Sequence, residues 1–339
     1  MSPKKNKTNR YNELFSNHLC DLGINVIDFD WRVDLFGFKN ILRMRAKDII
    51  HIHWPSTIYQ HENLVKNMIK IFLLFIQLFI LKIKKVDIVW TIHNIYPHEY
   101  KNKKIEKFVR QIIIDNCRII FSLGEGIKRS ILNEYKLTEN KIKVIKHGHY
   151  FGEYPENYFY SRESLNIKQD DVVFLFIGQI KAYKGIEELI DSFTKAEIEN
   201  SKLIIAGNPT KEMNSYIKEI NHESIIKITQ FIPDDDLVSL IGVCDYVVLP
   251  YKNITTSGTA ILAASYNKPI ILPDNECIRD YFNEEIAIFF KNNTEKSLVN
   301  ALHEACENIG DFKQSKFEEF RKELDWNKIA EEVVECYKK

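Results

Sequence analysis

The sequence predicts an α/β protein built from two Rossmann-like domains. Its 339 residues exceed the roughly 250–300 residues at which a single hydrophobic core stops growing. Short apolar runs rich in β-branched residues alternate with longer helical patterns along the chain, as in parallel sheets covered by helices. An irregular aromatic stretch, residues 150–161, separates two such series. We therefore expect a first domain over residues 1–155, a second over 156–315, and a C-terminal helix, 316–339, able to pack back on the first.

Each half supplies its own strands and helices. In the first half we predict strands at residues 25–29, 49–53, 87–92 and 119–122, and helices at 11–22, 63–81 and 105–117. In the second half we predict strands at 172–177, 202–206, 225–229, 246–249 and 269–272, and helices at 186–196, 213–220, 235–244 and 259–266. Ligands of doubly wound domains bind at the carboxyl ends of such strands. The functional residues should therefore follow the strands directly.

Charge divides the chain as sharply as the elements do. The net charge is zero, but residues 1–155 carry 26 Lys and Arg against 15 Asp and Glu, and the remainder carries 21 against 32. A basic half of +11 suits a polyanionic partner. Its basic residues are not interleaved with aromatic ones on a recognition fold, so we expect no nucleic acid and favour an anionic membrane surface.

An apolar segment in the basic half fits that partner. Residues 71–81 are flanked by Lys66, Lys70, Lys82, Lys84 and Lys85. The segment is shorter than the ~20 residues that span a bilayer. It is either a buried crossover helix or a helix that also lies in the membrane interface.

Features that the sequence lacks narrow the class of protein further. The six cysteines form no CxxC pair and are expected to be reduced thiols. Residues 1–10 are polar and basic, so we expect no secretory signal, a cytoplasmic location, and contact with the inner face of the membrane. The acidic run 234–236 is expected to begin a helix, where carboxylates favour exposed amides. We therefore expect no metal and no cofactor.

The stretch 174–185, FLFIGQIKAYKG, predicts an anion site. A buried strand ends at Gly178, Gln179 and Lys181 offer donors, and Lys184 begins the next helix. Free amides at a helix N-terminus and a nearby lysine both favour anions. Residues 245–259 repeat this arrangement with a Thr-Thr-Ser-Gly-Thr turn, so we expect both junctions to face one ligand, a nucleoside diphosphate. Lys184 would stabilise the charge on the departing nucleotide, although a glycine turn with a surface lysine is also common without function.

Histidines follow two strands of the first half. His53 and His93 each come directly after an apolar run, so both imidazoles should reach the carboxyl edge of the sheet. A neutral histidine there can accept a proton from a hydroxyl or bind a phosphate or sugar; a structural role is the alternative. His98 and Glu99 are further candidates, Glu99 being either a catalytic base or an exposed carboxylate. The sequence leaves the base open.

Three segments of the second half occur in the order and spacing of a known family. They are IIAGNP (204–209), FIPDDDL (231–237) and DYVVLPYKNITTSGT (245–259). With them the chain resembles GT-B glycosyltransferases of the glycosyltransferase 4-like group, which have two Rossmann-like domains facing across a cleft. The resemblance implies a binding site for the donor. It assigns Lys184, Thr256, Ser257, Gly258 and Thr259 to the diphosphate, and Asn208, Gln230 and Phe231 to the base. Gly178, Gln179 and Lys181 are expected beside these residues.

The first half resembles a narrower group. Residues 9–23, HIHWP (51–55) and WTIHNIYPHE (90–99) are similar to bacterial exopolysaccharide β-mannosyltransferase-type enzymes, which act on polyprenyl-diphosphate-linked sugars. The resemblance implies an acceptor side formed by Asn9, Tyr11, His53 and His98. It also implies a hexosyltransferase of surface polysaccharide synthesis, with His93, Glu99 and Lys184 as catalytic candidates.

The chain departs from the commonest family pattern at three positions. Two glutamates eight positions apart are replaced by Ile254 and Leu262, and the arginine after the first glycine by Gln179, with Lys181 as the substitute cation. Without the glutamates an inverting reaction fits at least as well as a retaining one. The donor is expected to be GDP-mannose, with a UDP-hexose open. A nucleotide-sugar epimerase or a catalytically silent subunit are the alternatives.

Overall fold

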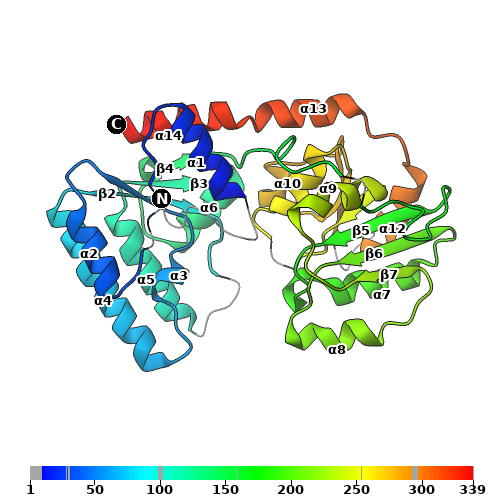
Figure 1. Ribbon diagram of the computed structural model, residues 1–339, viewed down its shortest axis with the longest axis horizontal. Coiled ribbons are helices and arrows are strands. Elements are labelled where there is room, and N and C mark those ends of the chain that lie inside the picture. The colour runs from blue at the N-terminus through cyan, green and yellow to red at the C-terminus, as the bar shows by residue number, and fades with distance from the viewer. Residues whose placement is uncertain are drawn as a thin grey trace. The chain divides into compact units, whose positions relative to one another are not determined.

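The computed structural model describes residues 10–27, 29, 31–97, 102–157, 159–252, 254–291 and 297–338. The chain separates into two compact units (Figure 1). Unit 1 contains Met1–Gly148 and Leu324–Lys339, and unit 2 contains His149–Glu323. The final helix therefore belongs to the same unit as the first part of the chain. The division falls at the beginning of the aromatic stretch 150–161.

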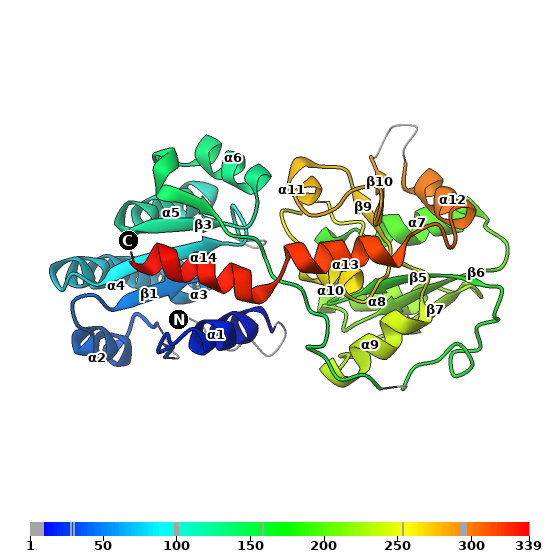
Figure 2. The ribbon, with the colours of Figure 1, turned by 90° about the horizontal axis from the view of Figure 1, so that it is seen from above.

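Unit 1 is built on a parallel sheet of order β1-β2-β3-β4. Its strands are β1 (Ile49–Ile52), β2 (Asp87–Ile92), β3 (Ile119–Ser122) and β4 (Ile142–Val144). Its helices are α1 (Tyr11–Asp21), α2 (Leu35–Arg43), α3 (Ser56–Tyr59), α4 (Leu64–Ile83), α5 (Lys103–Asn116), α6 (Glu125–Glu134) and α14 (Trp326–Lys338). Strand β2 is buried on both faces except at its first residue, as expected of a central parallel strand. Helix α14 packs on α1, and both lie beside one another in Figures 1 and 2.

The predicted strand at residues 25–29 is wrong for the part that the structure describes. Residues 24–27 and 29 adopt no strand, and Ile27 is 66% exposed. The β-branched apolar residues there are typical of a strand, but no described partner pairs with them. Strand β4 escaped prediction because three residues are too few to show alternation.

Unit 2 is a six-stranded parallel sheet of order β10-β9-β8-β5-β6-β7. Its strands are β5 (Val172–Ile177), β6 (Ser201–Ala206), β7 (Ile225–Ile228), β8 (Tyr246–Val248), β9 (Ile270–Pro273) and β10 (Ala287–Phe290). Its helices are α7 (Ile186–Ala196), α8 (Lys211–Glu219), α9 (Asp234–Val243), α10 (Gly258–Ser265), α11 (Glu276–Arg279), α12 (Leu298–Glu307) and α13 (Gln314–Glu323). Helix α9 begins at Asp234, which confirms the prediction for the acidic run.

The order of the unit 2 strands fixes where a ligand can bind. Strand β5 pairs with β6 on one side and with β8 on the other. The chain therefore passes from β5 to β6 on one side, and β8 is added on the other side of β5 later in the sequence. A crevice opens at the carboxyl ends of the strands at such a switch point. The loops after β5 and β8 flank it.

Candidate active site

Two glycines bring the backbones after β5 and β6 into contact. Gly178 has φ of +133° and Gly207 has φ of +142°, conformations that L-residues rarely adopt. A Cβ at Gly207 would lie 1.9 Å from the carbonyl oxygen of Gly178. A short parallel bridge continues beyond them, where the Ile180 amide donates to the Asn208 carbonyl at 3.1 Å. Only glycine fits at Gly207 without moving this turn.

Lys184 is held over the end of β5. Its Nζ lies 5.2 Å from the centroid of the Tyr251 ring, an arrangement that favours the cation. A Cβ built on Gly178 would lie 2.9 Å from the same Nζ, so the ammonium group stands directly beside the glycine turn. Within the described ranges, Lys184 forms no ion pair with a carboxylate. The result is a half-buried cation that is available to an anion.

The N-terminus of α10 supplies amides on the β8 side of the crevice. Ser257 caps the helix by accepting from the Ala260 amide at 3.1 Å, and its side chain is buried. The amides of Gly258 and Thr259 precede the intrahelical hydrogen bonds, as at any helix N-terminus. The Lys252 amide donates to the Tyr183 carbonyl at 3.2 Å. That bond joins the loop before α10 to the loop that carries Lys184.

The remaining residues predicted for the donor lie along the same edge with different exposure. Gln179 and Asn208 are exposed, whereas Lys181, Thr256 and Thr259 are half-buried. Gln230 and Phe231 follow β7, two strands away from β5, and Phe231 is 57% exposed. Ile254 is half-buried and Leu262 is buried within α10. The structure thus gathers Gly178, Lys184 and the start of α10, and leaves Phe231 as an open aromatic face further along.

Four histidines meet at the carboxyl edge of the unit 1 sheet. They are His51 in β1, His53 after β1, His93 after β2 and His147 after β4. His53 Nδ1 lies 3.2 Å from His93 Nε2, so one ring donates to the other. The Tyr11 ring packs against this pair, with centroids 5.6 Å from His53 and 4.9 Å from His93. The structure therefore brings together three residues predicted from the sequence: Tyr11, His53 and His93.

Burial keeps these imidazoles neutral. Loss of solvation, with His147 nearby, lowers the pKa of His93 to about 3, and burial lowers the pKa of His147 to about 4. Burial and the neighbouring histidines also hold the pKa values of His51 and His53 well below the ordinary range. At neutral pH the cluster consequently offers hydrogen-bonding groups rather than positive charge.

The members of the cluster differ in what they can reach. His51 is tied on both nitrogens, to Tyr337 Oη at 2.6 Å and to Thr91 Oγ1 at 2.7 Å. Tyr11 and His53 are each 1% exposed, whereas His93 is 9% exposed and stacks on Trp54 with centroids 4.5 Å apart. His53 Nε2 is buried and has no hydrogen-bond partner in the described part of the chain. His93 is thus the member closest to solvent.

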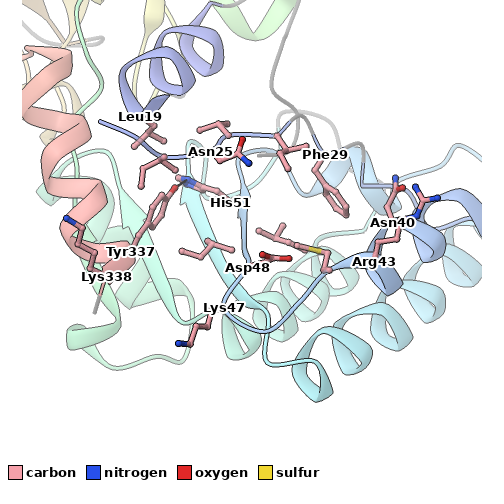
Figure 3. Close-up of a pocket in the computed structure, with 16 residues that line it drawn as sticks. Leu19, Asn25, Phe29, Asn40, Arg43, Lys47, Asp48, His51, Tyr337 and Lys338 are labelled. Atoms are coloured by element: carbon pink, nitrogen blue, oxygen red, sulfur yellow. Dashed lines mark hydrogen bonds between the residues drawn. The ribbon is translucent and has the colours of Figure 1, made fainter. Parts of the chain in front are cut away.

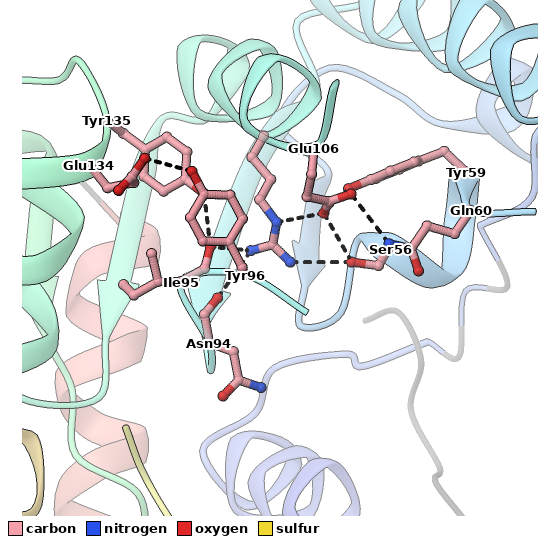
Figure 4. Close-up of polar contacts among 10 residues, drawn as sticks. Ser56, Tyr59, Gln60, Asn94, Ile95, Tyr96, Glu106, Glu134 and Tyr135 are labelled. Atoms are coloured by element: carbon pink, nitrogen blue, oxygen red, sulfur yellow. Dashed lines mark hydrogen bonds and ion pairs between the residues drawn. The ribbon is translucent and has the colours of Figure 1, made fainter. Parts of the chain in front are cut away.

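A buried ion pair holds Asn94 and Ile95, the two residues that follow His93 (Figure 4). Arg110 Nε donates to Glu106 Oε1 at 2.8 Å, and both side chains are at most 5% exposed. Arg110 Nη1 also donates to the carbonyls of Asn94 and Ile95, at 3.0 and 3.1 Å. Glu106 accepts further bonds from Tyr59 and Gln60. The pair therefore sets the backbone immediately after His93.

Glu106 and Arg110 were not predicted from the sequence as part of this site. One pattern in the sequence indicates them: an acidic and a basic residue lie four positions apart on a helix whose other buried residues are apolar. His147 was missed because its strand, β4, was not predicted. Asn9, His98 and Glu99 lie outside the described residues. Among the described residues no group of three or more His, Cys, Asp or Glu side chains could hold a metal ion.

A separate cavity of about 760 Å³ lies along the outer edge of β1 (Figure 3). Its apolar wall includes Leu19, Phe29 and Ile50, and Arg43 and Lys47 stand at its rim. His51 and Tyr337 line it as well, so it adjoins the histidine cluster from the side of the sheet. Its lining contains neither His93 nor Tyr11.

Comparison with known proteins identifies the fold and the class of enzyme. Residues 159–323, nearly all of unit 2, match the family model described as "Glycosyl transferases group 1". The fold is similar to that of Anabaena HepE in complex with UDP, with a TM-score of 0.69 and 14% identity over 85% of this chain and 78% of that one. The chain is a glycosyltransferase of the GT-B fold. This finding confirms the predicted fold class and the predicted hexosyltransferase activity.

Three proteins of similar sequence are relatives of this glycosyltransferase. The chain is 24% identical over 276 residues to a GDP-mannose:glycolipid 4-beta-D-mannosyltransferase of Xanthomonas campestris pv. campestris, covering 79% of this chain and 73% of that protein. A second protein of that name, from the same pathovar, is 26% identical over 71% of this chain and 65% of its own length. An uncharacterized glycosyltransferase of Methanocaldococcus jannaschii is 24% identical over 66% of this chain and 60% of its own length.

Proposed function

We propose that this glycosyltransferase moves mannose from GDP-mannose to a polyprenyl-diphosphate-linked saccharide at the inner face of the cell membrane. The product would enter a surface polysaccharide such as an exopolysaccharide, a capsule or an O-antigen. The names of the two mannosyltransferase relatives support the donor and the lipid-linked acceptor. The observation that carries the proposal is the half-buried Lys184 beside Gly178, without a carboxylate partner in the described ranges.

On the donor side the proposal assigns charge stabilisation. Cleavage of the bond between the sugar and the diphosphate leaves negative charge on the departing nucleotide. A cation and oriented amides in place before the reaction stabilise that charge without reorganisation. Lys184 supplies the cation, and the amides of Gly258 and Thr259 at the start of α10 supply the dipoles. Phe231 offers an exposed ring on which the base can stack.

On the acceptor side the proposal assigns orientation first. A histidine with a pKa of about 3 is a weak base at neutral pH. His93 therefore accepts a hydrogen bond from the acceptor hydroxyl and takes its proton only as the hydroxyl becomes acidic during bond formation. This role requires the tautomer in which His93 Nε2 donates to His53 Nδ1, because His93 Nδ1 is then the accepting nitrogen. Glu99 stays a candidate for the base.

Nucleotide binding tests the donor assignment first. GDP that binds the folded protein should raise its melting temperature, and UDP should do so less. Lys184→Ala should lower the rate of mannose transfer to a lipid-linked acceptor by about 100-fold or more without lowering the melting temperature of the free protein. Lys195→Ala is the matched control, because Lys195 pairs with Asp191 on the exposed face of α7. Full activity of the Lys184→Ala variant would remove this residue from the mechanism.

The same measurements distinguish the proposed function from its alternatives. A larger shift with UDP than with GDP would move the donor to a UDP-hexose. Conversion of the nucleotide sugar in the absence of acceptor would indicate an epimerase. No shift with either nucleotide would indicate a silent subunit.

A further inference from the structure

We propose that the outer face of α4 is the surface by which unit 1 docks on an anionic bilayer, with the helix axis parallel to the membrane plane. The inference rests on the proposed lipid-linked acceptor and adds the place and orientation of membrane contact. It follows from three observations: a continuous apolar stripe on α4, lysines along both sides of it, and an opposite face committed to the core of unit 1.

The stripe runs the length of the helix. Seven of its large apolar side chains are between 53% and 68% exposed: Leu64, Val65, Met68, Ile69, Phe72, Phe79 and Ile83. At about 100° per residue, the last six of these fall within roughly 60° of one direction. Globular proteins seldom expose so many large apolar side chains on one helix. Phe108 of α5, which is 59% exposed, adds to this surface next to the Phe75 ring.

Lysines border the stripe on both sides. Lys66 lies about 100° to one side of its centre and Lys82 about 100° to the other, and α4 contains no acidic residue. Lys84, which caps the helix on the side of Lys66, donates to the Leu42 carbonyl at 3.0 Å. Lysines in these positions let the apolar residues enter the interface while the ammonium groups reach the headgroups. Each lysine near an anionic surface adds to the attraction. Charge complementarity therefore selects an anionic lipid surface.

The inner face of α4 shows that the helix lies on the membrane rather than across it. By length and composition alone, the 20 residues are sufficient to span a bilayer. Ile71, Leu74 and Leu81 are nevertheless buried in unit 1. Gln77, also buried, accepts from Trp31 Nε1 at 2.7 Å and donates to the Arg32 carbonyl at 2.8 Å. A spanning α4 would lose these contacts and expose the core beneath it.

A second copy of the chain fits the stripe less well than lipid does. In a symmetric dimer the same surface meets itself, so the lysines that border one stripe would face those of the other. An anionic bilayer meets the same lysines with opposite charge. The experiment below treats dimerisation as an outcome that would overturn the proposal.

The test is flotation of the full chain with vesicles of phosphatidylcholine alone and with equimolar phosphatidylglycerol. Wild-type protein should float with the anionic vesicles and be released by high salt and by alkaline carbonate. The Phe72→Glu, Phe79→Glu double variant should bind roughly tenfold more weakly or worse. The control is Phe159→Glu in unit 2, because Phe159, Phe72 and Phe79 are each 64% exposed. It should bind like wild type.

Each other outcome overturns the docking surface. Wild-type protein that does not float, or a double variant that floats normally, removes α4 from membrane contact. Retention after carbonate would mean that the helix is inserted. A wild-type dimer in solution that the double variant dissociates would assign the stripe to a second copy. GDP-dependent stabilisation, measured without vesicles, tests the proposed function separately, so each proposal can fail alone.

Discussion

Replacement of Arg110 by Met should destabilise unit 1 by about 3–5 kcal/mol, since it removes one partner of a buried ion pair. The methionine keeps much of the volume but leaves the Glu106 carboxylate buried among neutral donors, Tyr59 and Gln60. The carbonyl of Asn94 also loses its Arg110 donor, whereas that of Ile95 retains the Tyr135 hydroxyl at 2.8 Å. The uncompensated carboxylate therefore dominates the cost.

The assay exploits the placement of tryptophan. All four tryptophans, Trp31, Trp54, Trp90 and Trp326, belong to unit 1. Urea unfolding followed by tryptophan fluorescence therefore reports unit 1 even when unit 2 unfolds at another denaturant concentration. The guanidinium also lies 5.3 Å from the Trp90 ring, so the baseline spectrum of each variant is compared before the midpoints are.

A matched ion pair serves as the control. Lys107 Nζ lies 2.8 Å from Glu134 Oε1, the same distance as in the buried pair, but Lys107 is 49% exposed. Lys107→Met should cost less than about 1 kcal/mol, because exposed pairs contribute little. The double variant Arg110→Met, Glu106→Leu should recover part of the loss, because the unpaired charge is gone. A loss below about 1 kcal/mol for Arg110→Met would refute the argument from burial.

Two further predictions concern the donor turn and the histidine cluster. Gly207→Ala should abolish stabilisation by GDP, because its Cβ would lie 1.9 Å from the Gly178 carbonyl, whereas Gly242→Ala, with nothing within 4 Å, should not; equal nucleotide-induced melting shifts would contradict this. Unit 1 should lose stability as the pH falls below about 6.5, because the pKa values of His93 (about 3) and His147 (about 4) lie below those of the unfolded chain, which takes up protons first. The loss should approach about 1.4 kcal/mol per pH unit for each histidine, and His93→Gln should reduce the slope of the tryptophan-monitored midpoint against pH; an unchanged slope would count against a neutral buried His93.

Long apolar runs made most of the fold predictable from sequence. The predicted strands 87–92, 119–122 and 172–177 coincide with β2, β3 and β5 residue for residue. Each is buried along nearly its whole length, and the helices between them show clear periodicity. Residues 25–29 failed for the opposite reason: the run is short, and although its residues favour a strand, pairing depends on a neighbour that the local sequence does not specify.

The candidate site was predictable only where its residues directly follow a strand or lie in a segment that resembles a known family. Tyr11, His53 and His93 were found because two of them end apolar runs and one lies in a resembling segment. The hydrogen bond between His53 and His93 joins the ends of two strands 40 residues apart, and no spacing rule reaches that far. Arg110 was missed for the same reason, since its role depends on the carbonyls of Asn94 and Ile95, 16 and 15 residues earlier.

In the proposed reaction, unit 2 contributes a positively charged group and unit 1 contributes neutral ones. Unit 2 presents an ammonium group and helix amides, which suit an anion that gains charge as the bond breaks. In unit 1, His93 and its neighbours are kept neutral by burial, which suits an uncharged hydroxyl that must not be repelled or protonated. A cationic histidine could not accept the hydroxyl proton, and a neutral residue at Lys184 could not offset the diphosphate. Burial in one unit and partial exposure in the other therefore give each site the charge that its half of a transfer reaction needs.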